Sequence, residues 1–200
     1  MRERIEAALR KTIEVHQGLI GQSALIEEAG RRLADVLAAG GSIYVMGNGG
    51  SAADSQHMAG ELVGRFLMER RPLPCHALTT DTSVLTAVAN DYGVREIFAR
   101  QVAAYVSKAD AVVGISAGGN SPNVLAGIEE ARRRGALTIG LTGGTGGELA
   151  KACDLAIVVP SSETPRIQEA HGTVIHILCD LVEQSLFGHA GRQQRPPSGA

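Results

Sequence analysis

Short runs of apolar residues alternate with longer segments of helical character along most of this chain. The apolar runs are SIYVM (42–46), CHAL (75–78), AVVGIS (111–116), LTIGLT (137–142) and LAIVV (155–159), each of a length that suits a buried strand. Regular alternation of strands and helices is typical of a parallel sheet with helices on both faces. The sequence therefore predicts an α/β fold, a three-layer sandwich with a parallel sheet flanked by helices.

Two helices are predicted before the first strand. Apolar residues repeat at helical spacing through 5–19 and 25–37, and AAGG (38–41) ends the second helix. A further long helix is predicted from about Pro165 to Phe187, with proline suited to its first turn. We expect part of the apolar surface of the N-terminal helices to face a neighbouring subunit. The alternative is that all of this surface packs on the helices' own domain.

Length and charge set the remaining bounds. The 200 residues suit one domain, expected over 1–188, with a disordered tail over 189–200 that is polar and rich in glycine and proline. A formal net charge of −2 gives no electrostatic sign of a nucleic acid or membrane partner. The N-terminus lacks the apolar core of a signal peptide, and the three scattered cysteines suit buried thiols. We therefore expect a cytoplasmic protein.

A glycine-rich turn follows the first predicted strand. It comprises Asn48, Gly49, Gly50 and Ser51, and a helix begins near the serine. Glycine permits positive φ and close approach of a ligand, while the first amides and the dipole of a helix favour an anion. No lysine follows the glycines, so this is not a Walker A loop, nor is it the dinucleotide fingerprint. Taken alone, the turn is equally typical of a capped strand-to-helix connection.

A second turn of the same kind follows the third predicted strand. Ser116, Gly118 and Ser121 precede a helix that carries Pro122 in its first turn. Open α/β sheets bind ligands at their carboxyl edge, where two such turns could converge. Together the two turns predict a phosphorylated small-molecule ligand. A third glycine-rich turn, LTGGTGGEL (141–149), is interpreted as a plain connection.

Two predicted helices carry the reactive side chains. His57 and Glu61 are four residues apart and share a helix face. On the last helix, His176 lies roughly 80° from Gln168, and His171 lies roughly 60° away on the other side. The two histidines of that helix therefore cannot easily serve one small site, and helical geometry alone does not choose between them. Two imidazoles, a carboxylate and a carboxamide could hold Zn²⁺, although each residue alone is more typical of a surface or core position.

Four segments together resemble the phosphoheptose isomerases of the sugar isomerase (SIS) fold group. They are GNGGSAADSQH (47–57), TTDTSVLTAVANDYG (79–93), SAGGNS (116–121) and TPRIQEAHGTVIH (164–176), in the order found in that family. The resemblance extends from the N-terminal helices to Phe187. It implies the SIS fold and a homotetramer, with the N-terminal helices used for packing and the active sites near subunit interfaces.

The resemblance also implies an activity and its residues. The expected reaction converts sedoheptulose 7-phosphate to D-glycero-D-manno-heptose 7-phosphate through an enediol or enediolate, for lipopolysaccharide or another surface glycan. Glu61 would take the carbon-bound proton, and His176 would manage protons on the opposite side of the substrate. One Zn²⁺ per subunit would be held by His57, Glu61, Gln168 and His176. The positions that match substrate-binding residues are Asn48, Gly49, Gly50, Ser51, Glu61, Asn90, Asp91, Ser116, Ala117, Gly118, Ser121 and Gln168.

The second loop departs from the family pattern. Family members commonly read S-T-S-G-N-S there, whereas this chain reads S-A-G-G-N-S, so hydroxyls are missing at Ala117 and Gly118. If each hydroxyl bonds phosphate, each loss costs about 1.5–3 kcal/mol, unless the extra glycine lets a backbone amide take over. The departure leaves the proposed acid/base groups intact. It favours weaker substrate binding or a different phosphosugar.

Three alternatives share parts of this pattern. A non-catalytic SIS protein that binds a replication-initiator partner has similar segments, but such relatives lack the pair of Glu61 and His176 that is present here. A sugar-phosphate sensing module of a transcription regulator would carry a DNA-binding domain, of which this sequence shows no sign. An isomerase of another phosphosugar is the third alternative, and the four expected metal positions favour the heptose enzyme over it.

Overall fold

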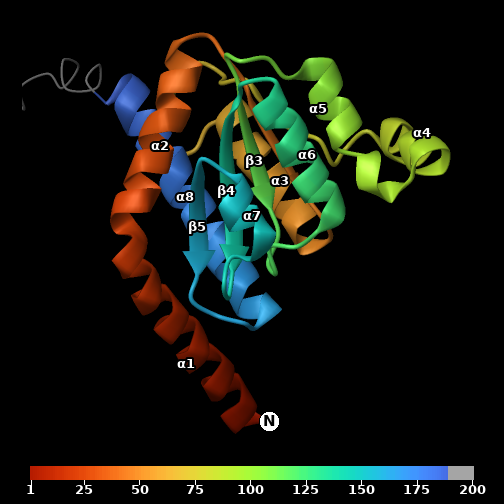
Figure 1. Cartoon of the computed structure of the whole chain (residues 1–200). Coiled ribbons are helices and arrows are strands. Elements are labelled where there is room, and N and C mark those ends of the chain that lie inside the picture. Colours follow the sequence, from red (N-terminus) through yellow and green to blue (C-terminus); the bar gives the residue numbers. More distant parts are fainter. Residues whose placement is uncertain (189–200) are drawn as a thin grey trace, which may run out of the picture.

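The computed structural model describes residues 1–188, and the predicted disordered tail over 189–200 lies outside this range (Figure 1). Helices and strands alternate after an N-terminal helical pair, as the apolar pattern predicts. The elements are α1 (Arg2–Leu19), η1 (Ile20–Gln22), α2 (Ser23–Ala38), β1 (Ile43–Gly47), α3 (Gly50–Val63), β2 (Cys75–Ala77), α4 (Thr82–Tyr92), η2 (Val94–Glu96), α5 (Ala99–Tyr105), β3 (Ala111–Ile115), α6 (Pro122–Arg133), β4 (Leu137–Gly143), α7 (Gly147–Ala152), β5 (Leu155–Val159) and α8 (Thr164–Phe187).

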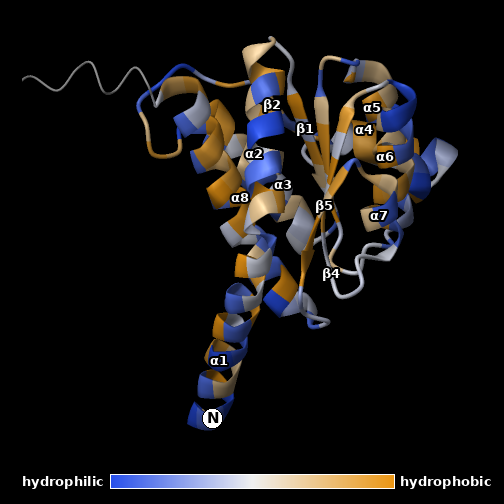
Figure 2. Cartoon of the chain, turned by 60° about the vertical axis from the view of Figure 1, so that its left-hand side comes forward, coloured by the Kyte–Doolittle hydropathy of each residue, from blue (hydrophilic) through white to orange (hydrophobic). Residues whose placement is uncertain are grey.

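The sheet has five parallel strands in the order β2-β1-β3-β4-β5, so the predicted fold class is confirmed. In the central pair, Ile43 lies opposite Ala111 and Gly47 opposite Ile115. Every residue of β1 and β3 is buried, because helices cover both faces of a parallel sheet. This burial explains why the strands read as continuous apolar runs, which Figure 2 shows as hydrophobic along the strands.

Two apolar cores lie on opposite faces of the sheet. One core joins α2, α3 and α8 to the sheet and includes Leu33, Met58 and Ile175. The other joins α5, α6 and α7 to the sheet and includes Phe98 and Ile128. The helices therefore form the two outer layers of the predicted sandwich (Figure 1).

The strand order creates a switch point between β1 and β3. The chain leaves β1 through α3 on one face of the sheet and leaves β3 through α6 on the other face. Ligands of open α/β sheets bind at such a point, beyond the carboxyl ends of the strands. The fold thus places the two glycine-rich turns next to each other at this edge.

Two helices project from the body of the molecule. The N-terminal part of α1 extends below it, and α4 stands out on the side away from α8 (Figure 1). None of the residues of α4 is buried. On α1, the large apolar side chains of Ile5, Leu9 and Ile13 are exposed in a row, and Ile20 of η1 is exposed as well. Part of the N-terminal helical surface is therefore free of the chain's own core.

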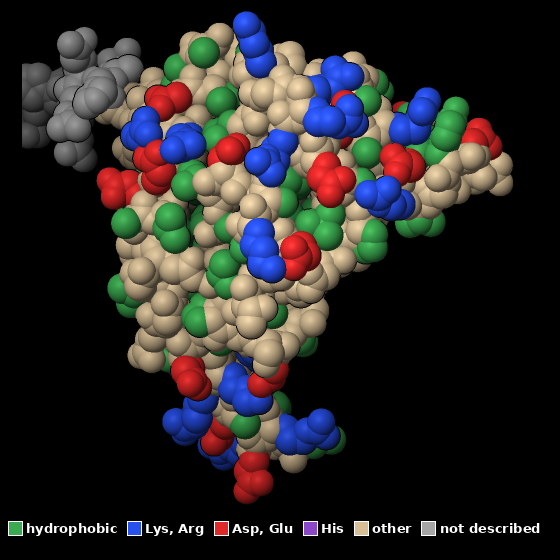
Figure 3. Space-filling view, viewed as in Figure 1, with side chains coloured by type: hydrophobic (Ala, Val, Ile, Leu, Met, Phe, Trp, Pro, Cys, Tyr) green, Lys and Arg blue, Asp and Glu red, His purple; other side chains and the backbone are tan. Residues whose placement is uncertain are grey.

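The rest of the surface carries mixed charge. Figure 3 shows acidic and basic side chains interspersed on the face in view. Across residues 1–188, no helix combines the length and apolarity that crossing a membrane requires.

Candidate functional site

The first glycine-rich turn leads directly into α3. Gly49 is the N-cap of that helix with φ +55°, a value that favours glycine. Gly50 permits a close approach, because a Cβ atom there would lie 2.4 Å from Nε2 of Gln168. The carboxamide of α8 therefore rests on the start of α3. Ser51, the next residue, is buried.

The second turn presents a pair of hydroxyl groups. Oγ of Ser116 and Oγ of Ser121 are 2.9 Å apart. Ser121 is the N-cap of α6, yet its hydroxyl makes no capping bond to the helix. Between them, Ala117 is half-buried and Gly118 is exposed, with open space where a side chain would stand. The loop thus keeps two hydroxyls and lacks the two that the family pattern would add.

The structure brings the two turns together. The side-chain amides of Asn48 and Asn123 exchange two hydrogen bonds of 2.8 Å, which join the first turn to α6. A cavity of about 440 Å³ opens beside them, lined in part by Asn48, Ser121 and Asn123. Arg95 also lines this cavity. Sequence reasoning missed this cation, because it lies in η2, far along the chain from either turn.

His57, Glu61 and His176 converge from α3 and α8. The Nε2 atoms of the two histidines are 3.0 Å apart, and Nε2 of His57 is 3.3 Å from Oε1 of Glu61. One donor atom from each of the three residues lies within 4.8 Å of the others. Two ligand atoms on a tetrahedral Zn²⁺ lie roughly 3.3 Å apart, so this donor set fits a single cation.

His171 does not join this cluster. Its ring is fully buried, and its Nε2 lies 3.1 Å from the backbone oxygen of Thr142. Burial lowers the pKa of His171, and the bond to Thr142 only partly offsets that effect. The rotation of α8 against α3 thus places His176, rather than His171, beside His57.

Two further residues near the cluster, Phe66 and Asp54, were not identified from the sequence. The ring of Phe66 stacks on the imidazole of His176, with centroids 5.3 Å apart and planes at 27°. Asp54 lies one turn before His57, and within residues 1–188 its buried Oδ2 has no hydrogen-bond partner. Burial raises the pKa of Asp54, although the charge of His57 opposes the shift. Phe66 carries no spacing signal, whereas Asp54 is three residues from His57 and so shares its helix face, a signal that the sequence does contain.

Asn90 and Asp91 lie apart from the other expected residues. Both are exposed near the end of α4, and the side chain of Asn90 donates to Oδ1 of Asp91 at 2.8 Å. Figure 1 shows α4 on the side of the molecule away from α8. Within one chain, these two residues are therefore not assembled with the histidine cluster.

Known proteins resemble this chain over almost its full length. The SIS domain family model matches residues 9–143. The phosphoheptose isomerase of Geobacter sp. (strain M21) is 54% identical over 188 residues, which cover 94% of this chain and 98% of that protein. The structure of phosphoheptose isomerase GmhA from Neisseria gonorrhoeae has a TM-score of 0.87 at 39% identity, covering 92% of this chain and 98% of that one. A phosphoheptose isomerase from Francisella tularensis gives 0.88 at 37% identity, with 91% and 97% covered.

Proposed function

The chain belongs to the phosphoheptose isomerase family of SIS-domain proteins, and on that premise we propose that it interconverts sedoheptulose 7-phosphate and D-glycero-D-manno-heptose 7-phosphate. The observation that carries the proposal is the convergence of His57, Glu61 and His176 on one point. An aldose–ketose isomerisation needs a base at carbon and a proton carrier at oxygen, and these side chains supply both.

In this proposal the glycine-rich turns hold the phosphate. The amides at Gly49 and Gly50 and the hydroxyls of Ser51, Ser116 and Ser121 supply donors at the start of two helices, where the dipoles favour an anion. Asn48, Ala117 and Gly118 complete the loop surface around it. Asn90 and Asp91 would line the sugar, which requires either that α4 approaches the site or that α4 of a second subunit does.

The residues of the cluster would divide the proton chemistry. Glu61 removes the proton from carbon through a carboxylate oxygen, and His176 passes protons at the substrate oxygens. Imidazole suits this task because it titrates near neutral pH. The side chain of Gln168, resting on Gly50, would orient the sugar between phosphate loop and cluster.

His57, Glu61 and His176, with Gln168 as the fourth ligand, would hold one Zn²⁺ per subunit. Imidazole nitrogens and carboxylate and amide oxygens are suitable donors for this ion. When bound, it would polarise the carbonyl group and stabilise negative charge on oxygen.

We also propose the setting of the reaction. The exposed apolar row of α1 supports a homotetramer in which subunits pack through their N-terminal helices. The enzyme would be cytoplasmic, and its product would feed heptose synthesis for lipopolysaccharide or another surface glycan.

The decisive experiment is conversion of sedoheptulose 7-phosphate by the purified protein, followed by NMR, with and without added Zn²⁺. We expect turnover by the wild type and its loss in Glu61→Gln and His176→Ala, with fold and assembly retained. Glu69→Gln, at an exposed position in the loop after α3, serves as the matched control and should keep full activity. Absence of conversion by the folded, metal-loaded wild type would contradict the proposal and favour another phosphosugar or a binding role.

A further inference from the structure

Arg70 and Glu183 form a buried ion pair next to the candidate site. Nε of Arg70 lies 2.9 Å from Oε1 of Glu183, and their side chains are 1% and 0% exposed. Removing two charges from water is costly unless further hydrogen bonds compensate for the lost hydration. An apolar pair of similar volume would often stabilise a fold equally well, so an ion pair here calls for another reason.

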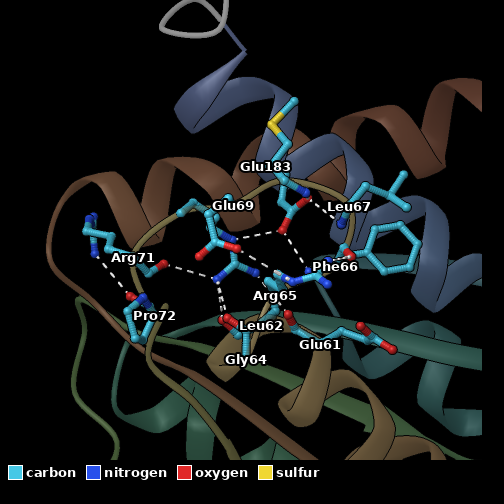
Figure 4. A network of polar contacts seen from close by, with 12 residues as sticks. Glu61, Leu62, Gly64, Arg65, Phe66, Leu67, Glu69, Arg71, Pro72 and Glu183 are labelled. Carbon is cyan, nitrogen blue, oxygen red and sulfur yellow. Dashed lines mark hydrogen bonds and ion pairs between the residues drawn. The ribbon is translucent and has the colours of Figure 1, made fainter.

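Glu183 receives four hydrogen bonds from one loop. Besides Arg70, its carboxylate accepts the backbone N–H groups of Phe66, Leu67 and Met68 at 2.8–2.9 Å (Figure 4). Burial alone raises the pKa of Glu183, but the three amides and Arg70 outweigh burial and hold it below its usual value. The carboxylate is therefore charged at neutral pH and fixes the loop that follows α3.

Arg70 binds the carboxyl end of α3. Its Nη2 donates to the backbone oxygen of Glu61 at 2.9 Å, and its Nη1 donates to those of Leu62 and Gly64 at 2.8 and 3.2 Å. Carbonyl groups at the end of a helix lack partners within the helix, and the dipole favours a cation there. The guanidinium thus links the last turn of α3 to Glu183 on α8.

Two other polar contacts between α3 and α8 lie at the candidate site. At the start of α3, Gly50 lies under Gln168, and in the middle, His57 faces His176. Glu183 is seven residues beyond His176, so both residues lie within roughly 20° of one face of α8. The buried pair is therefore attached to the same helix faces that carry the candidate site.

The loop that Glu183 binds also places the ring of Phe66 against the candidate site. Phe66 stacks on His176, and the N–H group of the same residue is bound by Glu183. Because one carboxylate fixes the backbone beneath the ring, the position of Phe66 depends on Glu183. The exposed ring of His176 is thus contacted by two rings, with the edge-to-face partner His57 on α3 and the stacking partner Phe66 in the loop.

We infer that the Arg70–Glu183 pair, acting through Phe66 and the end of α3, is a positioning device that holds His176 and Glu61 in working geometry. The inference rests on the proposed function for the roles of these two residues. It assigns Arg70, Glu183 and Phe66 no contact with substrate.

The first test compares kinetics of Glu183→Gln and Phe66→Leu with a matched control. Glu130→Gln is the control, because Glu130 is also buried and bound to arginines but lies on α6, in the other core. We expect kcat to fall about 10- to 100-fold in both test variants, while KM changes less than about twofold. This pattern is typical of residues that orient catalytic or metal-binding side chains without contacting the substrate. Glu130→Gln should lower thermal stability and leave kcat unchanged.

The second test does not depend on turnover. In the full-length protein with labelled histidine, the His176 ring resonances are assigned by their loss in His176→Ala, and Zn²⁺ affinity is measured by calorimetry. Both Glu183→Gln and Phe66→Leu should shift these resonances and weaken Zn²⁺ binding about tenfold or more, whereas Glu130→Gln should not.

The outcomes separate the two proposals. Loss of stability alone in Glu183→Gln, with unchanged His176 resonances and Zn²⁺ affinity, would overturn the positioning role. If Glu183→Gln does not fold, Phe66→Leu decides, because it keeps the ion pair and removes only the ring. A wild type that fails to convert sedoheptulose 7-phosphate would refute the proposed function, while the resonance shifts and metal affinities would still decide the positioning role.

Discussion

At the scale of single residues, Gly118 is one of the two positions, with Ala117, where the proposed phosphate loop lacks a hydroxyl of the family pattern. Its surroundings are open and its φ is not in the positive range, so a serine fits there without strain. A hydroxyl that bonds phosphate contributes about 1.5–3 kcal/mol, which corresponds to about tenfold or more in affinity. We expect Gly118→Ser to lower the KM for sedoheptulose 7-phosphate about tenfold. Gly118→Ala adds a side chain without the hydroxyl and should leave KM unchanged. Equal effects of the two variants would show that the hydroxyl does not reach the phosphate.

Gly50 offers a second prediction at this scale. A Cβ atom at this position would displace the carboxamide of Gln168, which is the flexible end of a side chain, so the fold should survive. We expect Gly50→Ala and Gln168→Ala each to lower kcat/KM about tenfold or more. The double variant should be little worse than either single one, because both remove the same contact. Gly60→Ala on the same helix, with open space around it, is the control and should keep activity. Additive losses in the double variant would show that Gly50 and Gln168 affect activity independently of each other.

The histidines show where sequence reasoning stops at this scale. Spacing alone identifies His57 and Glu61 as neighbours, because both lie on one helix. It leaves His171 and His176 as alternatives, since the choice depends on how α8 is rotated against α3. That rotation is set by tertiary packing, such as the burial of Ile175 and the bond of His171 to Thr142. Phe66 was not predicted because its stacking on His176 arises only from a contact across the fold.

At the scale of elements, the link between α3 and α8 predicts a dependence of stability on pH. The pKa of Glu183 lies below its usual value, because its amide and arginine partners outweigh the effect of burial. A carboxyl of this kind stabilises the fold above its unfolded pKa, about 4.3, and loses that effect as pH falls through its folded pKa. We expect the melting temperature of Glu183→Gln to lie below that of the wild type at pH 7, with the gap narrowing below about pH 4.3. Circular dichroism melts across pH 3.5–7 would measure it. A gap of constant size would show that Glu183 is not charged in the folded state.

Elements with a strong apolar pattern were predictable, and others were not. The five strands and α8 appear where the sequence predicts them, because each buries continuous or periodic apolar surface. The loop over 64–74 gave no sequence signal, since its order comes from hydrogen bonds to Glu183, a residue more than a hundred positions away. The position of α4 was also not predictable, because none of its residues is buried in this chain.

At the scale of the whole molecule, the arrangement of layers follows from the order of strands and helices. Right-handed crossovers place α3 and α6 on opposite faces of the sheet, and the switch point between β1 and β3 then brings the two glycine-rich turns together. The sequence could predict the layers and the convergence of the turns. It could not predict which parts of the surface stay uncovered, since that depends on the lengths and directions of α1 and α4.

The uncovered row on α1 leads to a prediction about assembly. Leu9 and Ile13 are 60% and 58% exposed, so charged residues there would disturb little of the chain's own core. In the proposed homotetramer, the same positions would place buried charges at an interface, which is costly. We expect Leu9→Glu/Ile13→Glu to reduce the mass measured by light scattering while circular dichroism stays unchanged. If active sites are completed across subunits, conversion of sedoheptulose 7-phosphate should fall in parallel with the loss of assembly.

Glu14→Gln, a polar and exposed position on the same helix, is the matched control and should keep both mass and activity. An unchanged mass for the double variant would contradict packing through α1, whereas a smaller, fully active species would show that one subunit contains a complete site.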